Sequence, residues 1–151
     1  MLRATEATFP IVCLQSVGAC TAQEIEDVHR VYLRAFERPG PILCVSDARL
    51  ASHEVQQRKL LAAWSERITP LGKDRVIATI VVLDSVVLRG ALIAMNWLSH
   101  PVIPQRVVPD LVGAVELGHE LAAQAGLEIG SDRWHHVRLW LEMGYLRANT
   151  G

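Results

Sequence analysis

Side chains that could carry chemistry gather first in the segment from residue 47 to residue 53. This segment supplies a carboxylate, a guanidinium, a hydroxyl and an imidazole, from Asp47, Arg49, Ser52 and His53. A phosphate on Ser52 would add about two negative charges near the start of a helix, where the helix dipole favours them. A plainer interpretation is that Ser52 only caps that helix and Arg49 is solvated. The segment is a candidate for partner binding, with a switch at Ser52.

A second cluster consists of Asp84, Ser85 and Arg89. Ser85 and Arg89 are one helical turn apart, so both side chains could contact one anion or one carboxylate of a partner. The alternative is a helix cap by Ser85 and a local ion pair for Arg89. Each cluster follows a strand-like run, and carboxyl ends of parallel strands meet at one edge of a sheet. We therefore expect the two clusters to form one surface of mixed charge.

Motifs typical of enzymes are absent from the sequence. It contains no G-x-S-x-G elbow, no P-loop and no dinucleotide fingerprint. His135 and His136 are adjacent, so on a helix they point about 100° apart and chelate one ion poorly. We predict a protein without catalysis, metal or cofactor. An enzyme would have to use Asp47, Arg49, His53 and Asp84 around one cleft, and this remains an alternative.

The run Val76–Leu83 indicates which kind of fold holds these two clusters in place. It is rich in Val and Ile, which is typical of a strand buried on both faces, with helices above and below the sheet. Asp84 or Ser85 can cap the apolar helix predicted from about Val86 to Leu98. Further strands are predicted at Phe9–Gln15, Pro41–Ser46 and, at an edge, Val102–Val108. Asp47–His53 is predicted to be a polar loop.

Helices are predicted between these strands and after them. Thr21 and Glu24 form a capping box before the first, and Ser52 precedes a second from about His53 to Ile68. Another follows Pro109, and the last spans about Arg133–Arg147. Alternation of strands and helices favours an α/β sandwich with a mixed, mostly parallel sheet of about four to five strands.

This order, with the phrases DSVVLRGALIAMNWL and PVIPQRVVPDLVGAVELGHELA, resembles bacterial STAS-like domains. The group is related to anti-sigma-factor antagonists and to cytosolic domains of sulfate transporters, and the resemblance covers about Phe9–Ala125. It implies a STAS-like domain over residues 1–130 and an added C-terminal helix over 131–151. It also implies a non-enzymatic regulatory module that binds another protein. The family phrase at its phosphorylation switch is Asp-Ser-Ser-Gly; VSDARLASHE retains Asp47 and Ser52 but lacks the paired serine and the glycine.

The C-terminal helix carries a large apolar face. Trp134, Val137, Leu141 and Tyr145 share it, with Trp140 at its edge. Aromatic residues contribute disproportionately to interfaces, and a two-fold dimer needs one such patch, so the face is a candidate self-association surface. The alternative is that this helix covers its own sheet.

Composition limits the classes of partner and the cellular compartment that the sequence allows. The 151 residues are 50% hydrophobic and carry a formal net charge of −1, which offers no basic field for nucleic acid. Three cysteines and no visible signal peptide favour a reducing cytoplasm. The apolar stretch Val76–Leu98 is interrupted by charge, so no membrane span is expected. A small-molecule or lipid carrier, as in the CRAL-TRIO group, is a further alternative, with the helix Val86–Leu98 lining the pocket.

Overall fold

The computed structural model describes residues 1–150 as a five-stranded sheet covered by helices. The strands are β1 (Leu2–Thr5), β2 (Ile11–Gly18), β3 (Ile42–Ala51), β4 (Val76–Val82) and β5 (Gln105–Val108). The helices are α1 (Ala22–Glu37), α2 (Val55–Gly72), α3 (Val86–Ser99), α4 (Leu111–Gln124) and α5 (Ser131–Thr150).

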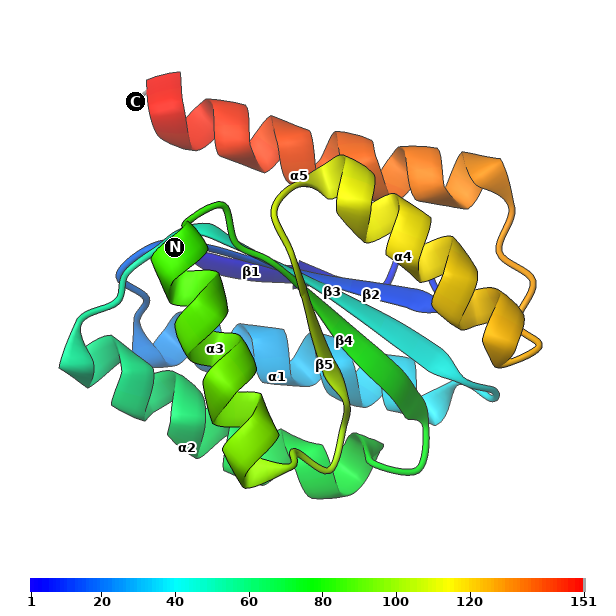
Figure 1. Cartoon of the computed structure of the whole chain (residues 1–151), viewed down its shortest axis with the longest axis horizontal. Coiled ribbons are helices and arrows are strands. Elements are labelled where there is room, and N and C mark those ends of the chain that lie inside the picture. Colours follow the sequence, from blue (N-terminus) through cyan, green and yellow to red (C-terminus); the bar gives the residue numbers. More distant parts are fainter. Residues whose placement is uncertain (151) are drawn as a thin grey trace.

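The sheet order is β1-β2-β3-β4-β5. β1 pairs antiparallel with β2, and the other neighbours are parallel. In Figure 1, α1 and α2 lie below the sheet and α4 and α5 lie above it. This confirms the mixed, mostly parallel sheet with helices on both faces.

Two apolar layers hold the sandwich together. Below the sheet, side chains of α1 and α2 such as Tyr32 and Trp64 pack on Leu14 and Cys44. Above it, Leu111, Trp134 and Leu141 pack on the other face of the strands. In β4 the two faces differ, because alternate residues are fully buried and half-buried. Two of the half-buried residues, Thr79 and Val81, face the α1/α2 side, where the cover is incomplete.

Local signals in the sequence explain several boundaries. At α1, Thr21 Oγ1 accepts from Glu24 N and the Glu24 carboxylate accepts from Thr21 N, which confirms the capping box. Ser85 Oγ accepts from Leu88 N at the start of α3. Asp110 caps α4 in the same way, through Gly113 N.

Two expectations about elements were wrong, one strand was not expected, and α2 ends at Gly72, beyond the expected end at Ile68. β1 was not predicted, because four residues with no strong apolar alternation give little signal. The segment Asp47–Ala51 continues β3 and is not a loop, since it pairs along β2 as far as Ala51. Ser52 does not cap α2: the N-cap is Glu54, whose side chain makes no capping bond. Pro70 lies inside α2, where its missing N–H costs one hydrogen bond near the helix end.

α3 differs from the other helices. None of its residues is buried, although its sequence is the most apolar helix in the chain. It lies beside β5, at the edge of the sheet (Figure 1). No helix within residues 1–150 combines the length and the hydropathy needed to cross a bilayer.

Candidate functional site

Asp47 and Arg49 form a buried ion pair and not an open reactive group. The Asp47 side chain is 2% exposed, and Arg49 Nη2 lies 2.8 Å from Asp47 Oδ2. Arg49 Nε and N donate to Asp47 Oδ1, and Gln15 Nε2 donates to Oδ2. The bond to Asp47, more than the opposing desolvation, raises the pKa of Arg49. Because both carboxylate oxygens already accept hydrogen bonds, Asp47 has a structural role here.

The same network binds the C-terminal helix to the sheet. Gln15 Nε2 donates to Leu141 O at 2.8 Å, and Arg3 Nη2 donates to Trp140 O at 2.7 Å. The Arg3 guanidinium stacks on Trp140, and that of Arg49 stacks on the Tyr145 ring. The predicted charged loop is thus in part the attachment point of α5.

This attachment corrects the predicted self-association surface. Trp134, Val137 and Leu141 are buried in the core of their own domain. Trp140 and Tyr145 are held by the arginine contacts above. Because these side chains contact other parts of the same chain, α5 covers its own sheet, which was the alternative interpretation. It also shares the core of residues 1–130 and does not form a separate layer.

The remaining residues of the two clusters lie near the carboxyl ends of β3 and β4, as expected. Ser52 Oγ accepts from Glu54 N at 3.4 Å, and His53 is exposed. Asp84 is close enough to Arg49 to raise its pKa further. Arg89 Nη1 donates to Leu83 O and Asp84 O at 2.8 and 2.7 Å. The guanidinium therefore holds backbone carbonyls, which makes it a poor ligand for an anion shared with Ser85.

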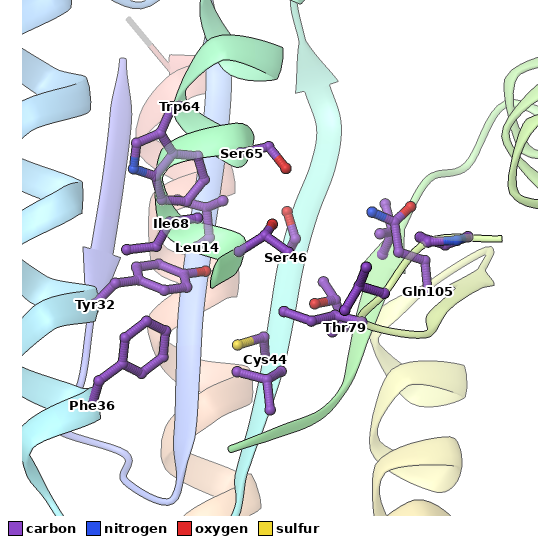
Figure 2. A pocket seen from close by; sticks show the side chains of 16 residues that line it. Leu14, Tyr32, Phe36, Cys44, Ser46, Trp64, Ser65, Ile68, Thr79 and Gln105 are labelled. Atoms are coloured by element: carbon purple, nitrogen blue, oxygen red, sulfur yellow. The ribbon is translucent and has the colours of Figure 1, made fainter. Parts of the chain in front are cut away.

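A cavity of about 230 Å³ lies on the α1/α2 side of the sheet. Figure 2 shows three aromatic rings of the helices, Tyr32, Phe36 and Trp64, on one side of it. Side chains of β3 and β4, including Ser46 and Thr79, form the floor. The chain between α3 and β5 closes the third side through Pro101, Val102 and Ile103, together with Gln105 at the start of β5.

The chemistry of this lining is neutral. No described residue that lines it is charged. Its polar groups are hydroxyls, one thiol, one amide and one indole N–H, which belong to Tyr32, Cys44, Ser46, Trp64, Ser65, Thr69, Thr79 and Gln105. Burial raises the pKa of the Cys44 thiol to about 12, and burial likewise raises the pKa of Tyr32 well above its usual value. Both groups therefore stay protonated and uncharged, and the cavity suits an apolar or weakly polar occupant.

An open groove adjoins the cavity. It measures about 620 Å³ and lies between the second half of α3 and β5, lined by Ile93, Asn96, Trp97, His100 and Arg106 among others. Pro101 and Gln105 line both spaces. A molecule longer than the cavity could therefore extend into the groove, where Arg106 and His100 provide a guanidinium and an imidazole. Residues 1–150 hold no group of three His, Cys, Asp or Glu side chains placed to bind a metal.

Sequence reasoning did not identify the cavity residues, apart from the suggestion that α3 lines a pocket. α3 contributes to the groove only. Single hydroxyl residues on strands, such as Ser46 and Thr79, were the sequence feature that could have indicated the cavity, since they interrupt otherwise apolar runs on the α1/α2 face.

Comparison with solved structures defines the fold class. The chain superposes with a TM-score of 0.58 on an uncharacterised DUF3478-family protein of Shewanella loihica PV-4, described as having a SpoIIAA-like fold. Identity is 12%, and the match covers 78% of this chain and 91% of that chain. No family profile and no curated protein matches the sequence. The chain thus has a SpoIIAA-like fold, which confirms the STAS-like architecture.

Proposed function

We propose that this protein is a non-catalytic binding protein for a small, elongated and mainly apolar molecule. The observation that carries the proposal is the uncharged cavity that ends in an open groove. Apolar area removed from water contributes about 25 cal/mol per Å² to binding, so aromatic walls of this kind favour a hydrocarbon chain.

The size of the two spaces limits the ligand. The 230 Å³ cavity is smaller than the roughly 300–1,000 Å³ pockets that hold drug-sized molecules. An occupant either is small or projects into the groove. Because Arg106 and His100 line only the groove, a chain with an acidic head would place its tail beside Trp64 and its carboxylate near Arg106.

A mass measurement tests this directly. Native mass spectrometry of freshly purified protein, without organic solvent, is expected to show a mass above that of the bare chain. Protein stripped of its ligand should then bind decanoate more tightly than butyrate, because more apolar surface is buried. An Arg106→Gln variant should bind decanoate more weakly than the wild type does, but should bind decanol equally well. Equal, negligible binding of all three compounds would contradict the proposal.

A second candidate function is regulated binding of another protein at the carboxyl edge of β3 and β4. The observation that favours it lies at the start of α2. The side chain of the N-cap residue, Glu54, makes no capping hydrogen bond, so the N–H groups in the first turn of the helix have no side-chain acceptor from the N-cap. A phosphate on Ser52 would lie beside them. If Ser52→Asp and Ser52→Ala co-purify the same partners as the wild type, this switch is excluded.

A further inference from the structure

We propose that the molecule held in the cavity carries a hydroxyl group at its buried end. This inference rests on the proposed function and narrows it, from apolar chains in general to chains that end in an alcohol. The observation behind it is a row of three polar side chains that crosses the floor of the cavity, formed by Cys44, Thr79 and Gln105.

The register of the sheet fixes this row. Cys44 of β3 is paired with Thr79 of β4, and Thr79 is paired with Gln105 of β5. Because neighbouring strands lie about 4.8 Å apart, the row extends about 10 Å from Gln105 to Cys44. Gln105 also lines the groove. The row therefore leads from the open groove to the buried Cys44.

The inner end of the row has hydrogen-bonding capacity to spare. The hydroxyls of Tyr32 and Thr79 both hydrogen-bond the Cys44 thiol, which lowers its pKa against the larger effect of burial. Figure 2 shows Cys44 between Tyr32 of α1 and Thr79 of β4. A hydroxyl that donates one hydrogen bond can still accept two. Thr79 can thus accept from a ligand while it donates to the thiol.

The outer end of the row lacks partners. Within residues 1–150, the side chains of Ser46 and Gln105 form no hydrogen bond. Ser46 lies two residues after Cys44 on β3 and also lines the cavity. An alcohol can donate to Thr79 and accept from the Gln105 amide. A terminal methyl group would exclude water from these polar atoms and leave them unpaired, which lowers affinity.

The lining also disfavours a charged group at the buried end. No described residue that lines the cavity is charged. A carboxylate placed there would lose its hydration with no cation to replace it. The buried end of the ligand is therefore neutral, and an alcohol supplies both the donor and the acceptor that the row can use.

Three acids of equal chain length test the proposal by isothermal titration of stripped protein. 10-Hydroxydecanoate is expected to bind about tenfold more tightly than decanoate, because its hydroxyl pairs with the row. Decanedioate should bind more weakly than decanoate. If 10-hydroxydecanoate binds no more tightly than decanoate, the alcohol is excluded while the proposed function stands. If none of the three acids binds, both proposals are overturned.

Variants test the role of the row itself. Thr79→Val keeps the shape of the side chain and removes its hydroxyl, so the tenfold preference should disappear while decanoate still binds. Gln105→Met gives a second comparison, in which the preference should also fall. Thr5→Val, a strand threonine outside the cavity, is the matched control and should retain the preference. A preference that persists in both Thr79→Val and Gln105→Met would overturn the assignment.

Discussion

Gly144 of α5 lies directly against Gln15 of β2, and a β-carbon at position 144 would overlap the Gln15 side-chain oxygen and the Arg3 guanidinium. Absence of a side chain at this point lets the helix approach the sheet closely. Gln15 can then donate to Leu141 O while it also reaches Asp47. One glycine therefore permits the polar network that attaches α5.

Gly144→Ala is expected to destabilise the protein by about 1–3 kcal/mol, because the added methyl group forces the helix away from the sheet. Chemical denaturation followed by circular dichroism measures the change. Gly90→Ala in α3 is the control: a β-carbon there meets nothing within 4 Å, and alanine should stabilise that helix by about 0.5–1 kcal/mol. Equal effects of the two variants would contradict the role of Gly144.

Asp47→Asn is expected to cost on the order of 3 kcal/mol. The substitution removes the negative charge that neutralises Arg49 in a largely buried site. The matched change is Asp27→Asn in the exposed Asp27–Arg30 pair, which should cost about 1 kcal/mol or less. Urea unfolding of both variants measures the two changes in stability. If Asp47→Asn leaves the free energy of unfolding unchanged, Asp47 does not stabilise the fold.

The buried thiols should resist alkylation. Burial raises the pKa of Cys13 and of Cys44 to about 12. Deprotonation is therefore favoured only above that pH, and at pH 8 the thiolate fraction is on the order of 10⁻⁴, far below that of an ordinary cysteine. Iodoacetamide at pH 8 should leave both thiols of the folded protein unmodified and label them after unfolding in guanidinium.

An exposed thiol provides the reference for that experiment. Ala62→Cys on α2 should react at the rate of a free cysteine. Labelling of Cys13 at the same rate as residue 62 in folded protein would contradict its burial between the sheet and α5.

Ser46→Leu should fill the cavity from its floor. Decanoate affinity is expected to fall at least tenfold, since the added side chain occupies the ligand volume. Ala62→Leu adds similar apolar surface on the exposed side of α2 and should leave affinity unchanged. Isothermal titration of stripped protein distinguishes them; if both variants bind as the wild type does, the ligand does not occupy this cavity.

The sequence predicted much of the architecture because its signals there are local. Thr21 and Ser85 are caps that act through the next three residues, and the apolar run at β4 is long enough to identify a strand. β1 and the extension of β3 to Ala51 depend on pairing with β2, which no local pattern reports.

The candidate site was harder to predict for a related reason. Asp47 and Arg49 looked available for chemistry because their neighbours Gln15 and Tyr145 are distant in sequence. The apolar character of α3 suggested burial, whereas the helix lies beside β5 with a free outer face. Its position leaves the α1/α2 side of β4 partly uncovered, and the cavity results from that gap.

Chemical-shift mapping is the most direct measurement of ligand binding in this cavity. Amide and indole signals of stripped, ¹⁵N-labelled protein would be recorded as decanoate is added. The largest changes should occur at Trp64, Thr79 and Gln105, with small changes in α4 and α5. Changes confined to α4 and α5, or none at saturating decanoate, would contradict a ligand site between the sheet and α2.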